Sequence, residues 1–294
     1  MPVTAPGEAE PSDVGGSPRA AGPAAERPLD EQVLHRTENG VSWITLNRPE
    51  AMNAVTWEQR ERVIALLDAA SADRGVRAVV LTSAGRGFCA GADLRAGPRA
   101  GGGGGQRVAG DVARMIRQGA QRLVTAVLDC EKPVVAAVGG TAAGIGAHLA
   151  FACDLVVAAE SARFVEVFVR RGLVPDGGGA YLLPRLVGPQ RAKELMFFGD
   201  AVPAADAARL GLVNRVVPDG EVERCAREWA ERLAQGPTRA IALAKQLVNA
   251  SLDGDRATAL AAEAAAQEIN MATADAAEGV AGFVERRTPR FRGR

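Results

Sequence analysis

The chain has 294 residues, of which 47% are hydrophobic, which is enough for one large domain or for a domain with a helical appendage. Lys+Arg and Asp+Glu each number 35, so the formal net charge is zero, and this balance argues against nucleic acid as the main partner. The four cysteines lack Cys-x-x-Cys spacing and there are two histidines, which argues against a zinc site, and no apolar run is long enough to span a membrane.

Residues 1–28 are rich in Pro, Gly and Ala and carry almost no large apolar side chains. Such a segment cannot bury enough surface to offset the entropy lost on ordering, so we predict a disordered tail. It contains no basic segment followed by an apolar one, as a secretory signal peptide would. With cysteines that we interpret as reduced thiols, these features predict a cytoplasmic protein.

The first regular elements are a strand and an amphipathic helix. Residues 41–46 are β-branched and aromatic, and Asn47-Arg48-Pro49 ends that strand. Apolar residues recur at helical spacing over 57–72, with Thr56 as the expected N-cap and Gln59 completing a capping box. A buried strand over 77–83 follows. Because this order of elements recurs later in the chain, we predict repeated ββα units in an α/β fold.

A second buried strand, 133–138, leads into a glycine-rich turn and a small-residue helix over 147–153. The turn does not fit a P-loop, because Ile145 and Gly146 occupy the Lys and Ser/Thr places. It does not fit a dinucleotide fingerprint either, because Leu149 replaces the third glycine. Two interpretations remain: an oxyanion hole, in which unpaired N–H groups at a helix N-terminus face a developing anion, and a tight packing turn.

The other segments are assigned by pattern. Five consecutive glycines make 96–110 a flexible surface loop, which can also serve as a lid over a pocket. The remaining predicted elements are helices over 111–129, 188–199 and 203–210, a helix after 175–179, strands over 154–159 and 212–217, an extended segment over 161–169, and helices from 221 to the end.

Four ordered blocks carry a resemblance to a known family: NRPEAMNA (47–54), FCAGADL (88–94), GLVPDGGG (172–179), and FVERR (283–287) followed by Pro289 and Phe291. Over about residues 30–294 the chain resembles the enoyl-CoA hydratase/isomerase (crotonase) superfamily. The resemblance implies a crotonase (ClpP-like) spiral of ββα repeats over 29–220 and a C-terminal helical oligomerisation layer over 221–294. It also implies a homotrimer or a dimer of trimers.

The same resemblance implies an acyl-CoA thioester as substrate and a shared chemistry, the stabilisation of a thioester enolate. By position, the oxyanion donors would be the backbone N–H groups of Ala92 and Ile145. The CoA moiety is part of the substrate, so no separate cofactor and no metal are expected.

The chain departs from the hydratases of this family, which use two glutamates. His148 stands at the first glutamate position and Phe168 at the second. Glu166 is two residues from Phe168, and in an extended segment it would lie about 7 Å along the strand, too far to substitute. We therefore do not expect hydration by the two-glutamate route.

Asp176 and His148 are the candidate catalytic side chains. In isomerases and dehalogenases of the superfamily an aspartate at the place of Asp176 does the chemistry, and the surrounding block resembles the ring-epoxide isomerases of phenylacetate degradation. The alternative for Asp176 is an N-cap of the following helix. His148, in the first turn of its helix, is expected as a neutral imidazole that accepts a proton or lines the pocket, the alternative being a hydrogen-bonded core histidine.

The remaining predicted contacts are to substrate and CoA. By resemblance, they involve Ala51, Ala90, Asp93, Leu94, Gly144 and Phe168, with Phe283 and Arg286 approaching the nucleotide end from a neighbouring subunit. Isomerisation is the first prediction. The alternatives are enoyl-CoA hydration and, from another class, a non-catalytic acyl-CoA binding protein. The sequence does not identify the acyl group.

Overall fold

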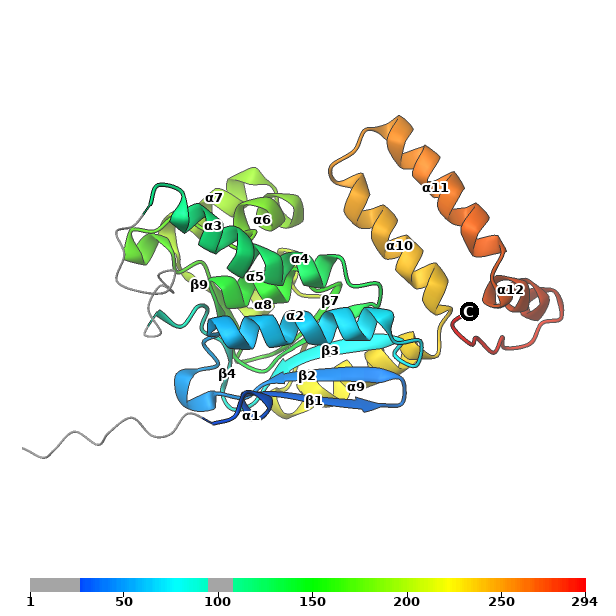
Figure 1. Cartoon of the computed structure of the whole chain (residues 1–294), viewed down its shortest axis with the longest axis horizontal. Coiled ribbons are helices and arrows are strands. Elements are labelled where there is room, and N and C mark those ends of the chain that lie inside the picture. The colour runs from blue at the N-terminus through cyan, green and yellow to red at the C-terminus, as the bar shows by residue number, and fades with distance from the viewer. Residues whose placement is uncertain (1–26, 95–107) are drawn as a thin grey trace, which may run out of the picture.

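The computed structural model of the chain describes residues 27–94 and 108–294, so most of the predicted tail (1–28) and loop (96–110) lies outside the described residues. Two sheets, the helices that cover them and an arm of C-terminal helices make up the described part (Figure 1). In these ranges no helix is both long enough and apolar enough to cross a bilayer.

The main sheet has six strands in the order β1-β2-β3-β5-β7-β10. All neighbours pair in parallel except β1 and β2, which form a hairpin at Asn39-Gly40. Both turn residues have positive φ, as a two-residue type I′ turn requires. The bounds are β1 Val33–Glu38, β2 Val41–Leu46, β3 Ala78–Ser83, β5 Val134–Val138, β7 Leu155–Ala159 and β10 Arg215–Val217.

The smaller sheet has four strands in the order β4-β6-β8-β9. The chain passes from the main sheet to the smaller one and then into a helix, first as β5–β6–α5 and then as β7–β8–α6. The predicted ββα repeats are therefore confirmed. The bounds are β4 Gly87–Cys89, β6 Thr141–Ala143, β8 Arg163–Val165, β9 Ala201–Pro203, α5 Ile145–Phe151 and α6 Gly179–Val187.

Helix α2 (Trp57–Ala72) has the predicted bounds and the predicted capping box of Thr56 and Gln59. The helix predicted over 111–129 is interrupted by one π-helical turn, Arg117–Gln121, between α3 (Asp111–Ile116) and α4 (Arg122–Leu128). The other elements are α1 Leu29–Gln32, η1 Pro49–Ala51, η4 Val169–Arg171, α7 Pro189–Phe198, α8 Ala204–Arg209 and η5 Asp219–Glu221.

The core lies between the main sheet and its covering helices. Trp43, Ile44, Leu67, Leu81 and Phe88 are among its fully buried side chains. The four cysteines are also buried and unpaired, as the sequence predicted.

The C-terminal helices are α9 (Val222–Ala234), α10 (Thr238–Ser251), α11 (Arg256–Met271) and α12 (Ala274–Val284). Helix α9 packs on β3, β5 and β7 of the main sheet, whereas the division predicted at residue 220 groups it with the C-terminal helices. Its apolar side chains are buried in the core of the ββα repeats. Helices α10–α12 form the arm that extends from this body (Figure 1).

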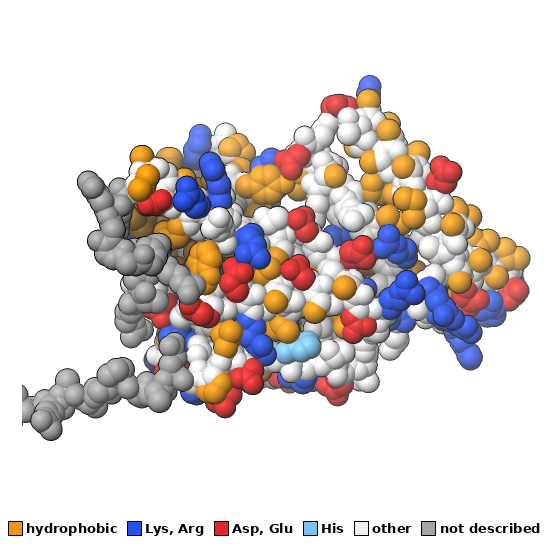
Figure 2. Space-filling model, viewed as in Figure 1, with side chains coloured by type: hydrophobic (Ala, Val, Ile, Leu, Met, Phe, Trp, Pro, Cys, Tyr) orange, Lys and Arg blue, Asp and Glu red, His pale blue; other side chains and the backbone are white. Residues whose placement is uncertain are grey.

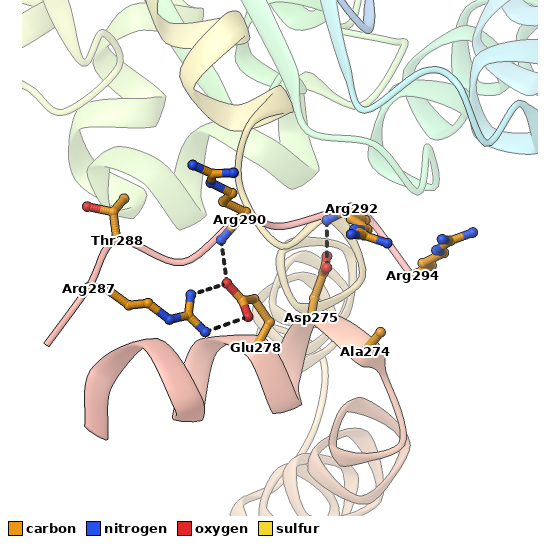
Figure 3. A pocket seen from close by; sticks show the side chains of 8 residues that line it. All are labelled: Ala274, Asp275, Glu278, Arg287, Thr288, Arg290, Arg292 and Arg294. Atoms are coloured by element: carbon orange, nitrogen blue, oxygen red, sulfur yellow. Dashed lines mark hydrogen bonds and ion pairs between the residues drawn. The ribbon is translucent and has the colours of Figure 1, made fainter. Parts of the chain in front are cut away.

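The end of the chain folds back along α12. The buried Asp275 carboxylate accepts from the N–H groups of Arg292 and Gly293, and Glu278 pairs with Arg287 (Figure 3). Hydrophobic side chains are exposed along α11 and α12, next to a group of arginines (Figure 2). They include Leu260, Ile269, Val280, Phe283 and Val284.

Candidate active site

The first predicted oxyanion donor, the N–H of Ala92, points away from its neighbouring strand. Ala92 forms a parallel bridge with Val55, whose N–H donates to the Gly91 carbonyl at 2.8 Å and whose carbonyl accepts from Asp93 N–H at 3.0 Å. In this parallel pattern the two bonds to Val55 come from the residues that flank Ala92, so the N–H of Ala92 itself faces the opposite side.

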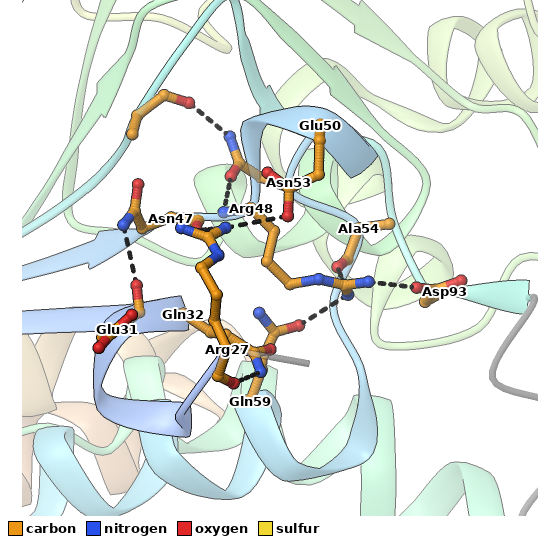
Figure 4. Close-up of polar contacts among 11 residues, drawn as sticks. Arg27, Glu31, Gln32, Asn47, Arg48, Glu50, Asn53, Ala54, Gln59 and Asp93 are labelled. Carbon is orange, nitrogen blue, oxygen red and sulfur yellow. Dashed lines mark hydrogen bonds and ion pairs between the residues drawn. The ribbon is translucent and has the colours of Figure 1, made fainter. Parts of the chain in front are cut away.

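A network of polar side chains fixes the segment that contains Ala92 and Asp93 (Figure 4). The Arg48 guanidinium pairs with the Asp93 carboxylate at 3.0 Å and donates to the Ala54 carbonyl, also at 3.0 Å. The Asn53 amide donates to the carbonyls of Ala84 and Gly87. The Asp93 side chain is therefore a structural anchor.

The second predicted donor, the N–H of Ile145, lies at the start of α5. Gly144 precedes it with φ 53° and ψ −121°, and as the first helical residue Ile145 has no carbonyl one turn before it to accept its N–H. A β-carbon built on Gly91 would lie 3.7 Å from Ile145 N, and one on Gly146 only 2.1 Å from the Cys89 carbonyl oxygen. The two segments thus touch, which is compatible with the predicted pair of donors.

His148, one turn further along α5, is completely buried. Its Nε2 lies 3.1 and 3.0 Å from the two carboxylate oxygens of Glu166. Its ring stacks on Phe168, with centroids 5.4 Å apart and planes 12° apart. Nδ1 is also buried, and it has no hydrogen-bond partner. A hydrogen-bonded core histidine would have partners at both ring nitrogens, whereas His148 has one only at Nε2.

The position of Glu166 corrects the sequence interpretation. We expected an extended segment over 161–169 that keeps Glu166 too far away to take part. The strand instead ends at Val165, and Phe168 has helical dihedrals (φ −58°, ψ −50°) before the turn of 3-10 helix η4. This bend brings both Glu166 and Phe168 onto His148. The sequence signal was Gly172, which caps η4 in the left-handed conformation.

Asp176 lies just before α6, and it does not cap that helix. The N-cap is Gly178, with no side-chain cap bond. The Asp176 Oδ1 atom is buried and without a hydrogen-bond partner. Burial raises the pKa of the Asp176 carboxyl above its ordinary value, and the charges of His148 and Arg60 oppose that rise. The cap alternative is thus not observed.

Arg60 on α2 was missed by the sequence reasoning. A β-carbon on Gly119, in the π-helical turn, would lie 2.8 Å from one of its guanidinium nitrogens, so the turn leaves room for this side chain. Burial lowers the pKa of the Arg60 guanidinium, an effect that Asp176 and two glutamates oppose. Single π-helical turns are frequent at functional sites, but no sequence pattern signalled this one.

Three unpartnered atoms identify the centre of the site. In the described part of the chain, the buried side-chain nitrogen and oxygen atoms without a hydrogen-bond partner are Arg60 Nε, His148 Nδ1 and Asp176 Oδ1. The Asp176 carboxylate interacts electrostatically with both His148 and Arg60, so the three side chains belong to one neighbourhood. Because an unsatisfied buried polar atom costs about 1–3 kcal/mol, their concentration at one place indicates a site that a ligand completes.

The predicted CoA contacts are only partly brought together. The N–H groups of Ala51, Ala90 and Asp93 already donate to the carbonyls of Arg48, Met52 and Val55. Leu94 is exposed, whereas Gly144 and Phe168 lie against each other beside His148.

Phe283 and Arg286 lie at α12, far from β4 and α5 in the same chain (Figure 1). Phe283 is 85% exposed. Neither residue can complete this site except from another subunit. Within residues 27–94 and 108–294, no group of three or more His, Cys, Asp or Glu side chains could hold a metal ion.

Comparisons with known proteins agree with this fold. The family model described as Enoyl-CoA hydratase/isomerase matches residues 36–294. A probable enoyl-CoA hydratase of Rhodobacter capsulatus is 41% identical over 89% of this chain and 98% of its own length. The 1,2-epoxyphenylacetyl-CoA isomerase of Escherichia coli is 37% identical over 90% of this chain and 99% of its own length. A crystal structure of an enoyl-CoA hydratase/isomerase from Cupriavidus metallidurans has a TM-score of 0.82 at 36% identity, covering 90% of this chain and 97% of that one.

Proposed function

Because the chain belongs to the enoyl-CoA hydratase/isomerase family and has its crotonase fold, we propose that it is an acyl-CoA isomerase that moves a proton through a thioester enolate. The thioester oxygen would accept hydrogen bonds from the N–H groups of Ala92 and Ile145. These donors stabilise the negative charge that develops on that oxygen, and so they make the α-proton easier to remove. The CoA moiety belongs to the substrate, and no further cofactor takes part.

Asp176 is the base that removes this proton. One observation carries the assignment: its Oδ1 is buried beside His148 with no hydrogen-bond partner, and the carboxylate does not cap the adjacent helix α6. Because burial raises the pKa of this carboxyl, the carboxylate accepts a proton more readily than an exposed aspartate would. A single carboxylate of this kind suffices to move a proton between two carbons.

Hydration is the second candidate, and the hydratase names of several relatives favour it. It needs acid/base groups on both sides of one water molecule, and Phe168 at the second glutamate position cannot transfer a proton. The Glu166 carboxylate is nearby, but it is bound to His148. A non-catalytic acyl-CoA binding protein is a further alternative, which the unpartnered Oδ1 of Asp176 does not favour.

Proton abstraction can be measured directly. In D2O, a 3-enoyl-CoA should gain deuterium and convert to the 2-enoyl isomer, whereas hydration would add the mass of one water. We expect Asp176→Asn to abolish both exchange and isomerisation, and Asp68→Asn, at an exposed position of α2, to leave them unchanged. Tight acyl-CoA binding without exchange in the wild-type protein would favour the binding protein instead.

The site is completed by a second copy of this chain, in a homotrimer or a dimer of trimers. The exposed apolar side chains of α11 and α12 support this assembly, because such a surface is costly to leave in water. Phe283 and Arg286 would then reach the CoA nucleotide of the neighbouring subunit.

A further inference from the structure

Glu166 and His148 form a buried pair that the proposed reaction does not yet use. Glu166 is 4% exposed and His148 is 0% exposed, so neither side chain exchanges protons freely with solvent. Both carboxylate oxygens of Glu166 lie within hydrogen-bond distance of Nε2, at 3.0 and 3.1 Å. No other hydrogen bond is made by either side chain among the described residues, so each depends on the other for its orientation.

The imidazole cannot turn away from this partner. Phe168 stacks on one of its faces. A β-carbon on Gly179 would lie within 2.2–3.1 Å of three ring atoms, so the ring is packed directly against the backbone at the start of α6. The ring is therefore held between Phe168, the α6 backbone and the carboxylate of Glu166.

The Nδ1 atom faces the turn that carries Asp176. A β-carbon on Gly177 would lie 3.7 Å from Nδ1, and no residue of the described chain satisfies this nitrogen. Asp176, immediately before Gly177, has its own unpartnered Oδ1. When Nε2 carries the proton, Nδ1 and the Asp176 carboxylate are two hydrogen-bond acceptors that face the same region. A proton on either of them would allow a hydrogen bond between the two groups.

We propose that Glu166 is a positioning residue that keeps the proton of His148 on Nε2, so that Nδ1 stays free to accept a hydrogen bond from Asp176 once Asp176 has taken a proton from the substrate. This inference rests on the proposed function for its catalytic part. In the step, the α C–H bond of the acyl group breaks and an O–H bond forms on Asp176. The new O–H group donates to His148 Nδ1 until the proton returns to another carbon.

The carboxylate of Glu166 is suited to this task because it is only an acceptor. A histidine whose one nitrogen donates to a carboxylate has its tautomer and its ring orientation fixed. The other charges that face this region are Asp176, before α6, and Arg60, on α2. Among the side chains of the described residues, Glu166 alone is hydrogen-bonded to Nε2.

The tautomer can be read by 15N NMR of the full-length protein labelled at histidine, because the chain has only two histidines. His35→Gln removes the other signal; His35 is an exposed residue of β1. At pH 7.5 we expect His148 to give a protonated Nε2 that exchanges slowly with water and an unprotonated Nδ1. A protonated Nδ1 with an unprotonated Nε2 in the wild-type protein would overturn the proposal, and this readout needs neither activity nor a variant at Glu166.

Glu166→Gln supplies the kinetic test. Its amide can also donate to Nε2, so we expect the Nδ1–H tautomer to appear in the NMR spectrum. We expect kcat of isomerisation to fall about 10- to 100-fold with KM nearly unchanged. The matched control is Glu160→Gln, at an exposed position, which should leave both constants and the spectrum unchanged. An unaltered spectrum with unaltered kcat in Glu166→Gln would contradict the proposal.

The two claims fail separately. If Asp176→Asn keeps full isomerisation, then the base is wrongly assigned and the catalytic part of the inference falls with it. The predicted tautomer of His148 would still be tested by the spectrum alone.

Discussion

A β-carbon on Gly179 would lie 2.2 Å from Nε2 of His148, so the backbone at the start of α6 is in direct contact with the imidazole. We predict that Gly179→Ala displaces the ring and breaks its bond to Glu166, although alanine is the better helix former. Overpacking of this kind costs about 1–3 kcal/mol of stability. Thermal melting and kcat/KM should both fall. The control is Gly139→Ala, where a β-carbon meets nothing within 4 Å, and equal results for the two variants would refute this contact.

The turn before α5 gives a second prediction. Ile145 acts through its N–H, so Ile145→Val should keep most of the activity. A β-carbon on Gly146 would lie 2.1 Å from the Cys89 carbonyl oxygen, so Gly146→Val should push α5 away from β4 and separate the two donors. We expect a loss of activity of at least about 100-fold, the range seen when one oxyanion-hole donor is removed. Steady-state kinetics of the two variants, compared at equal folded fraction, test this.

Asp176→Asn should stabilise the protein while it abolishes activity. The folded state raises the pKa of this carboxyl above its ordinary value of 3.8, so the folded protein prefers the neutral acid. Below pH 3.8 both side chains are neutral and the variant should match the wild type. As the pH rises through the folded-state pKa, the wild type loses stability that the variant keeps. Urea unfolding at pH 4 and pH 8 measures this difference, and a variant that is less stable than the wild type at pH 8 would contradict a pKa raised by burial.

Arg60 should affect the pKa of the proposed base, Asp176. Its charge lowers the pKa of Asp176, so Arg60→Met should raise that pKa further. The carboxylate must be ionised to remove a proton, so the acidic limb of the kcat/KM profile should move to higher pH. Arg60→Lys, which keeps the charge, should move it less. Identical acidic limbs for the two variants would show that Arg60 does not act on the base.

Much of the fold follows from local patterns. The strand over 41–46 and the helix over 57–72 were predicted with their observed bounds, because the strand has β-branched content and the helix has both periodicity and a capping box. The packing of α9 on the main sheet could not be predicted in the same way. Its apolar stripe shows which face is buried, but not which partner covers that face.

The site was less predictable because it depends on two short departures from regular structure. Strand β8 ends at Val165 and the chain bends into a turn of 3-10 helix after Phe168, which brings Glu166 to His148; periodicity alone extends the strand past both residues. One π-helical turn at 117–121 makes room for Arg60, and no sequence pattern announces it. Asp176 and His148 were found because they stand at family positions, whereas the bond that links His148 to Glu166 exists only in the folded chain.

The most direct test of the account compares two reactions of the purified wild-type protein. One is the isomerisation of a 3-enoyl-CoA and the other is the hydration of crotonyl-CoA, each followed by mass and measured again in Asp176→Asn. The account predicts isomerisation that the variant loses by at least about 100-fold, and weak or absent hydration in both proteins. Hydration with a turnover near 10 per second or more that survives Asp176→Asn would contradict it, because the acid/base groups would then be other than those assigned here.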